Sequence, residues 1–283
     1  MRTTFGTLLI TALLLGHSPL VAQGWPQEEG GGYYKLGLNL TRSDKFYEGE
    51  GNVVTIPTFA DYTVSLYGEY GITKGITGIL YLPFVKRLTL NRQVGQPSGF
   101  VYSEGDGVTG IADPEVGLRI GLLRSGPVVI TAGLKLGIPL GESEQENGLL
   151  TGDGEFNQIL SAGLGYSFYP IPAYASLHGG LNNRTEGFSD EVVYGGEFGY
   201  TFGGKVTAIG RLVGVGSLNN GDANVRGGMG GASANNQSYL SYGLEGAWQL
   251  SKDLGISLGV TSAFFGQNTL SAPSFSTGVY LKR

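Results

Sequence analysis

A two-residue alternation between apolar and polar side chains governs residues 115–140, "EVGLRIGLLRSGPVVITAGLKLGIPL". Arg119 stands between Leu118 and Ile120, and Lys135 stands in an equally apolar setting. A helix would scatter these residues around its surface, whereas successive side chains of a β-strand point to opposite faces. The run therefore predicts two strands with one apolar face, and both cations lie on the other face.

The same period recurs along the chain. Most of the segments exceed the ~5–6 residues of strands in soluble sheets and match or slightly exceed the ~9–11 residues of a tilted membrane-crossing strand. The twelve predicted strands are 33–42, 61–72, 75–89, 112–123, 127–139, 157–169, 171–182, 190–202, 205–216, 237–250, 254–265 and 272–282.

Short and long connections alternate between these strands. The short ones are 72–75, 124–127, 169–172, 202–205 and 250–254, and the longer ones are 43–60, 90–111, 140–156, 183–189, 217–236 and 266–271. Transmembrane barrels have short periplasmic turns, longer outer loops and an even strand number. We predict an all-β protein, a transmembrane antiparallel β-barrel of about 12 strands, with both chain ends on the periplasmic side. A soluble sandwich or lipocalin-like barrel is the alternative, but its interior would be too large for these small and polar side chains to fill.

The N-terminus predicts export. "MRTT" is a positive start, "FGTLLITALLLG" an apolar core, and small residues follow near Ala22. Residues 1–23 thus read as a signal peptide cleaved near Ala22 or Gln23, which leaves 24–283 as the barrel. A membrane anchor is the alternative, but the apolar core is too short to span. The chain has no cysteine, which excludes lipoprotein processing and a disulfide framework.

Composition and aromatic placement favour the cell outer membrane. Charged residues make up 14%, against the ~25% usual for soluble domains. The net charge of −5 is spread along the chain and indicates no nucleic-acid partner. Aromatic residues on the apolar face fit the interfacial girdles of outer-membrane barrels; they are Tyr62, Tyr70, Phe84, Tyr166, Phe168, Tyr200, Phe202, Trp248 and Phe264.

The alternation assigns ionisable side chains to the barrel lumen, which is polar in this class. The predicted lumen residues are Lys35, Glu69, Arg87, Glu115, Arg119, Lys135, His178, Glu197, Arg211 and Glu245. Counting back from the tight turns sets Glu115 opposite Lys135 and Glu197 opposite Arg211, with Glu245 at similar depth on the next strand. Two interpretations stay open: a selectivity lining for a solute pathway, or an ion-pair network that fills a closed lumen.

Three segments contain residues that could suggest a chemical or ion-binding function. "GDGVTG" (105–110) matches a dinucleotide-binding fingerprint, but it follows a loop and precedes a strand, where the mechanism needs the N-terminus of a helix. Ser176 and His178 could suggest a lipid hydrolase, but they stand in the reverse of the H-x-S order and fall on the inner face. The acidic loop 142–155 reads as solvated, with weak divalent-ion bridging to lipopolysaccharide as an alternative. We predict no enzyme activity, no cofactor and no metal site.

The resulting function hypothesis is a passive channel or transporter for small solutes. A non-conducting structural barrel, or an adhesion protein acting through the Gly- and Asn-rich loop 217–236, is the alternative. Expected partners are outer-membrane lipids, lipopolysaccharide and the barrel-assembly machinery.

Several segments resemble outer-membrane families. "GWPQEEGGGYYKLG" (24–37) and "SLYGEYGITKGITGILYLPF" (65–84) resemble the XagA-like outer-membrane proteins. "GIADPEVGLRIGL" (110–122), "LKLGIPLG" (134–141) and "LLTGDGEFNQ" (149–158) are similar to the transporter-like barrels of the meta-pathway of phenol degradation family. The resemblance implies an outer-membrane location and a transport role. The C-terminal "STGVYLKR" departs from the usual assembly signal, because it ends in Arg283 rather than an aromatic residue.

Overall fold

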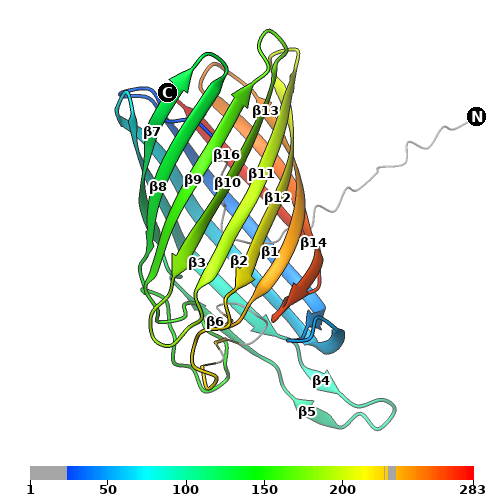
Figure 1. Ribbon diagram of the computed structural model, residues 1–283. Coiled ribbons are helices and arrows are strands. Elements are labelled where there is room, and N and C mark those ends of the chain that lie inside the picture. The colour runs from blue at the N-terminus through cyan, green and yellow to red at the C-terminus, as the bar shows by residue number, and fades with distance from the viewer. Residues whose placement is uncertain (1–23, 226, 229–233) are drawn as a thin grey trace, which may run out of the picture.

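Twelve long strands form one closed antiparallel barrel in the computed structural model, which describes residues 24–225, 227–228 and 234–283 (Figure 1). The predicted signal peptide, 1–23, lies outside the described residues. The barrel strands are β1 (Gly32–Tyr47), β2 (Val53–Thr73), β3 (Ile76–Leu90), β7 (Glu115–Ser125), β8 (Val128–Gly137), β9 (Asn157–Ser167), β10 (Ala173–Asn183), β11 (Glu191–Phe202), β12 (Val206–Ser217), β13 (Ser238–Gln249), β14 (Leu254–Gln267) and β16 (Ser274–Lys282).

The sheet closes on itself through β1. Each barrel strand pairs with its neighbours along the chain, and β1 pairs with both β2 and β16. Lys35 of β1, for example, lies between Tyr67 of β2 and Tyr280 of β16. Closure pairs backbone groups that an open sheet edge would leave without partners. The predicted all-β, twelve-stranded antiparallel barrel is confirmed.

The two ends of the barrel differ, as the connection lengths predict. The short turns and the C-terminus lie at one end, the upper end in Figure 1, and the long connections lie at the other. We call these the turn end and the loop end. Two predicted loops contain short strands. In 90–111, β4 (Gln93–Val94) and β5 (Val101–Ser103) form a hairpin and β6 (Asp106–Gly110) pairs with β3, and in 266–271, β15 (Thr269–Leu270) pairs with β1.

The predicted loop 43–60 is wrong. β1 continues to Tyr47 and β2 begins at Val53, so most of that segment is a strand pair that extends the barrel wall. The acidic loop 142–155 is also only partly solvated. Leu149 and Glu155 are fully buried in it, and Leu149 packs with Phe59 and Leu88 inside the loop end.

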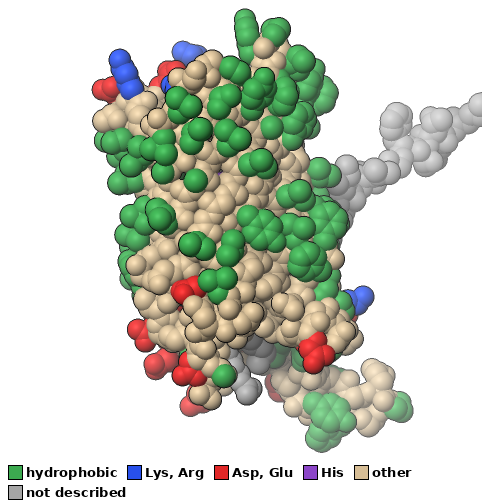
Figure 2. All heavy atoms as spheres, viewed as in Figure 1, with side chains coloured by type: hydrophobic (Ala, Val, Ile, Leu, Met, Phe, Trp, Pro, Cys, Tyr) green, Lys and Arg blue, Asp and Glu red, His purple; other side chains and the backbone are tan. Residues whose placement is uncertain are grey.

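The outer wall of the barrel is apolar. Figure 2 shows hydrophobic side chains over much of the wall in view, and the exposed ones include Leu160, Leu177, Leu244, Trp248 and Phe264. Among the described residues, no helix is long and apolar enough to cross a membrane.

A bulge in β3 reverses the face of its second half. Leu66 of β2 lies opposite Leu82, but Val64 lies opposite Val85, so β3 contains one extra residue at Pro83–Phe84. A one-residue shift moves every following side chain to the other face. The prediction that Arg87 faces the lumen is therefore wrong: Arg87 is exposed, and its neighbour Lys86 lines a lumen cavity.

The turn-based register is correct for one strand pair and wrong for another. Glu197 lies directly opposite Arg211, as predicted. Glu115 lies opposite Gly137, and Lys135 lies opposite Gly117, because the β7–β8 hairpin is offset by two residues from the predicted register. Lys135 and Glu115 still meet on the diagonal, with Nζ and Oε2 2.6 Å apart.

The bulge can be tested by comparing Leu88 with Arg87. Leu88 is fully buried against Phe59 and Leu149, so Leu88→Ala should lower the free energy of unfolding by about 2–5 kcal/mol. Arg87→Ala should change it by less than about 0.5 kcal/mol. Urea unfolding in lipid vesicles measures both, and a larger loss for Arg87→Ala would contradict the reversed face.

Candidate functional site

An inner cavity of about 720 Å³ occupies the turn-end half of the lumen. Tyrosine rings and charged side chains line it together; the rings include Tyr33, Tyr67, Tyr174 and Tyr280, and the charged groups on barrel strands include Lys35, Glu69, Arg119, Glu197, Arg211 and Glu245. Six of the predicted lumen residues therefore line this cavity: Lys35, Glu69, Arg119, Glu197, Arg211 and Glu245.

A chain of alternating charges crosses the wall of the inner cavity. Lys35 Nζ lies 2.9 Å from Glu245 Oε1. The Arg211 guanidinium bonds to both Glu245 and Glu197, and the Tyr174 hydroxyl donates to Glu197. Each carboxylate in this chain therefore faces at least one cation, so the chain carries little net charge.

Glu69 and Arg119 form a second, deeply buried ion pair. Arg119 Nη2 donates to Glu69 Oε1 over 2.9 Å, and Nη1 donates to Oε2 over 3.2 Å. The Arg119 side chain is only 3% exposed and the Glu69 side chain only 5%. The Tyr67 hydroxyl also donates to Glu69, over 2.5 Å. A charge pair this well bonded links β2 to β7, the two strands that flank β3 in the barrel wall.

The first residues of the N-terminal segment 24–31 lie inside the barrel and bind to this pair, whereas Glu28, Glu29 and Gly30 are exposed. Arg119 Nη1 donates to the Trp25 carbonyl over 2.9 Å, and Gln27 Nε2 donates to Glu69 Oε2 over 2.7 Å. The Gln27 backbone N–H donates to Thr77 Oγ1 over 2.8 Å. Trp25 and Gln27 both line the inner cavity. The segment therefore occupies part of the lumen near the turn end, a role that its sequence did not indicate.

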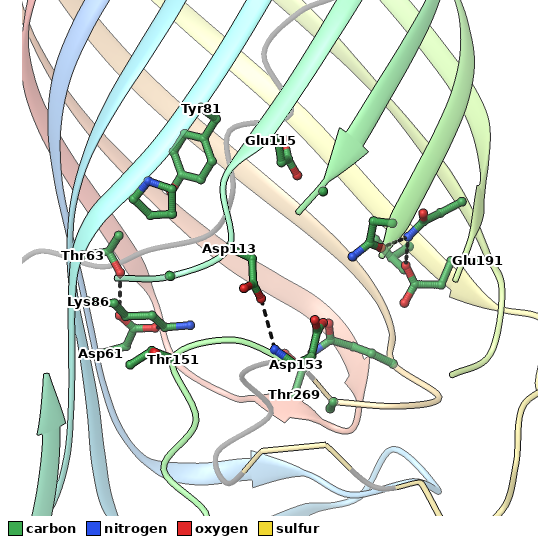
Figure 3. Close-up of a pocket in the computed structure, with 18 of the residues that line it drawn as sticks. Asp61, Thr63, Tyr81, Lys86, Asp113, Glu115, Thr151, Asp153, Glu191 and Thr269 are labelled. Atoms are coloured by element: carbon green, nitrogen blue, oxygen red, sulfur yellow. Dashed lines mark hydrogen bonds and ion pairs between the residues drawn. The ribbon is translucent and has the colours of Figure 1, made fainter. Parts of the chain in front are cut away.

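An outer cavity of about 300 Å³ lies towards the loop end (Figure 3). Asn39 and Tyr239 line both cavities, so the two adjoin. The predicted lumen residues Glu115 and Lys135 lie here rather than in the inner cavity. The other charged residues of its lining are Asp61, Lys86, Asp113, Asp153, Arg184 and Glu191.

Arg184 joins three carboxylates at the rim of the outer cavity. Its Nε donates to Glu155 over 2.6 Å, Nη1 to Glu191 over 2.9 Å, and Nη2 to Asp153 over 3.3 Å. Its guanidinium also lies 4.5 Å from the centre of the Phe188 ring. Sequence reasoning missed this cluster, because Arg184 follows β10 and Asp153 and Glu155 precede β9, where the two-residue alternation does not apply.

Asp153 is held in an unfavourable electrostatic environment. Burial and the neighbouring carboxylates of Glu155 and Asp113 raise the pKa of Asp153 to about 7, although Arg184 opposes the shift. Asp113 itself accepts backbone N–H groups from Leu140 and Gly141, which hold the acidic loop against the barrel. The loop end therefore concentrates carboxylates around a single guanidinium.

Ser176 and His178 do not form a nucleophile and base pair. Both belong to β10, and the Ser176 hydroxyl and the two ring nitrogens of His178 are buried without hydrogen-bond partners in the described part of the chain. The described residues include no cluster of His, Asp or Glu that could hold a metal ion. His178 lines neither the inner nor the outer cavity.

The fold is shared with outer-membrane barrels of known structure. The chain is similar to an outer membrane channel from Pseudomonas putida F1, with 14% identity, a TM-score of 0.69, and coverage of 95% of this chain and 100% of that one. It is also similar to the NanC porin, with 7% identity, a TM-score of 0.52, and coverage of 89% and 98%. The KdgM porin in complex with oligogalacturonate gives 8% identity, a TM-score of 0.50, and coverage of 88% and 98%.

No family model matches the chain, and no curated protein matches it in sequence. At these identities the structural likeness establishes the barrel fold alone.

Removal of the Arg119 charge should destabilise the barrel. Arg119→Gln leaves the Glu69 carboxylate buried without its counter-ion, which should lower the free energy of unfolding by about 3–5 kcal/mol. The double variant Glu69→Gln/Arg119→Gln should recover a large part of this loss, because it removes both charges. Unfolding in lipid vesicles measures the coupling, and equal losses in the single and double variants would contradict a strong pair.

The raised pKa of Asp153 predicts a pH dependence of stability. The Asp153 carboxyl group keeps its proton in the folded protein up to about pH 7, whereas the unfolded chain releases it near pH ~4. The contribution of Asp153 to the free energy of unfolding therefore falls as the pH rises from about 4 to about 7. Asp153→Asn removes this contribution and should flatten that part of the profile. Thermal unfolding midpoints across the range measure it, with the exposed Glu144→Gln as control. An Asp153→Asn profile parallel to that of the parent protein would contradict the raised pKa.

Proposed function

We propose that this protein is an outer-membrane channel that passes small solutes through its lumen. The observation that carries the proposal is the pair of adjoining cavities inside a closed barrel, lined by charged, hydroxyl and tyrosine side chains. A barrel that served only as a scaffold would gain more stability from apolar packing than from so many buried charges. The space and the polar lining suit a solute pathway.

The location proposed for the channel is the outer membrane. The apolar outer wall would lie in lipid, with the turn end in the periplasm and the loop end outside, next to lipopolysaccharide. Export through a cleaved signal peptide (1–23) and insertion by the barrel-assembly machinery belong to the same proposal. The names of the similar structures, which include a channel and two porins, support it, as does the resemblance to the XagA-like and phenol-degradation barrel families.

The N-terminal segment 24–31 is the proposed gate of this channel. It binds to the lumen wall through Trp25 and Gln27, and it narrows the path at the turn end. Neutral hydrogen bonds contribute about 0.5–1.5 kcal/mol each, and those to charged groups about 1.5–3 kcal/mol. These few hydrogen bonds can break transiently, and the segment would then leave the path. Solute flux would depend on this displacement.

A non-conducting structural barrel is the second candidate. The buried Glu69–Arg119 pair and its bonds to segment 24–31 favour it, since they would also stabilise a permanently plugged lumen. The two candidates differ in whether the segment moves.

A disulfide that fixes the segment tests the gate. A side chain added at Gly121 would approach Pro26 Cγ to 2.9 Å, and the chain has no native cysteine to interfere. Planar-bilayer currents of Pro26→Cys/Gly121→Cys should be suppressed under oxidation and restored by reduction. The two single-cysteine variants are the controls and should respond to neither treatment.

Two results would contradict the proposal in different ways. Currents that persist in the oxidised, cross-linked protein would reject segment 24–31 as the gate. Absence of channel events in the parent protein across a range of voltages would reject the passive channel and favour the structural barrel.

A further inference from the structure

The outer cavity carries more negative than positive charge. Its lining includes Lys86, Lys135 and Arg184 on the positive side. Against these three cations stand five carboxylates: Asp61, Asp113, Glu115, Asp153 and Glu191. Figure 3 shows labelled carboxylates on several sides of the cavity. A cavity with this imbalance stabilises a positive guest and repels a negative one.

The imbalance is greatest around Arg184. One guanidinium faces Asp153, Glu191 and the fully buried Glu155. Lys135 is bonded to Glu115, and Lys86 lies 3.9 Å from Asp61, so neither lysine is free to compensate the Arg184 cluster. Two of the three carboxylates at Arg184 therefore lack a cation of their own.

Asn182 adds an acceptor that has no partner. Its Nδ2 donates to Asn157 Oδ1 over 2.6 Å and to Glu191 Oε2 over 3.1 Å, which fixes the orientation of the amide. Its Oδ1 is buried and accepts no hydrogen bond from the described residues. Asn182 is 4% exposed and lines the outer cavity. A buried acceptor without a donor is costly unless a ligand supplies one.

The required ligand carries both positive charge and hydrogen-bond donors. The described residues include no metal-binding cluster, and a bare metal ion brings no N–H donor. A neutral polyol supplies donors but leaves the charge excess in place. A protonated amine supplies both, because an ammonium group has three donors and no acceptor.

We propose that the outer cavity is a binding site for small organic ammonium ions, held by Asn182 Oδ1 and the carboxylates of Asp153 and Glu191. The cavity volume of about 300 Å³ limits the guest to a small solute. Exposed Glu142, Glu144 and Glu146 lie in the neighbouring loop, and Figure 2 shows acidic side chains gathered at the loop end. Their field would raise the local concentration of cations at the entrance.

This proposal adds a class of solute, small organic ammonium ions, to the proposed channel function. It rests on that function for the uptake of the bound solute through the barrel. Binding itself does not require conduction. The raised pKa of Asp153 supports the assignment, since a bound cation would relieve the repulsion from Glu155 and Asp113. Ammonium binding should then be tighter at about pH 8, where Asp153 is ionised, than at about pH 6.

Equilibrium dialysis of the full-length protein in detergent tests the site with probes of matched length. Putrescine is a diammonium ion, 1,4-butanediol is its neutral counterpart, and succinate is its dianionic counterpart. We expect putrescine to bind at least about tenfold more tightly than either. Comparable affinity for butanediol would indicate a polyol site, and preference for succinate would indicate an anion site. Either result would overturn the proposal.

Two substitutions locate the site. Asp153→Asn and Glu191→Gln keep the shape of the side chains and should each weaken putrescine binding by about tenfold. Asp153→Asn should also remove the difference between pH 6 and pH 8. Asp253→Asn, an exposed carboxylate in the turn between β13 and β14 at the opposite end of the barrel and outside the cavity lining, is the matched control and should bind as the parent protein does. Unchanged binding in both cavity variants, if they keep the parent thermal unfolding midpoint, would reject the site.

A second measurement separates this inference from the channel proposal. Putrescine binding without channel events would keep the site and reject conduction. Channel events without putrescine binding would keep conduction and reject the site.

Discussion

Closure of the sheet through β1 is the constraint on which the rest of the molecule depends. β1 pairs along its length with β2 on one side and with β16 on the other, so the first and last barrel strands meet. An unpaired edge in lipid would cost several kcal/mol for each exposed backbone group. With the edge removed, every residue of a strand must face either the outside of the barrel or the lumen. That division allows Lys35, Arg119 and Arg211 to lie in a wall that is otherwise apolar.

The same division explains how far the sequence could predict the structure. The two-residue period gave the barrel, its strand number and the lumen side of Glu69 and Arg119, because both faces follow from parity alone. Parity fails at a bulge. The extra residue at Pro83–Phe84 places Lys86, rather than the predicted Arg87, on the lumen face of β3. It also says nothing about loops, so the Arg184 cluster was not predicted. The position of Trp25 and Gln27 in the lumen depends on contacts with residues far along the chain, which no local pattern reveals.

Segment 24–31 completes the inner cavity as well as narrowing it. Glu69 accepts from Arg119, Tyr67 and Gln27, so the segment supplies one of the donors that satisfy a nearly buried carboxylate. Arg119 in turn donates to the Trp25 carbonyl. Movement of the segment would leave these groups to water or to a passing solute. In the proposed channel, a polar solute at this position could bond to Glu69 and Arg119 in place of the segment, so the groups that hold the segment in the lumen would also be the groups that contact the solute.

In the proposed channel, the distribution of charge along the lumen would place selectivity in the outer cavity rather than in the inner one. In the inner cavity Lys35, Arg119 and Arg211 are balanced by Glu69, Glu197 and Glu245, and each is bonded to one of them. Paired charges of opposite sign largely cancel at the distance of a solute in the middle of the cavity. The carboxylates around Arg184 do not cancel, because three of them share one cation. In the proposed channel, a solute entering from the loop end would meet the net negative field of the outer cavity first. In the inner cavity the bonded pairs largely cancel, and Lys282 and Arg283 add positive charge at its turn end, so cations would be favoured at entry.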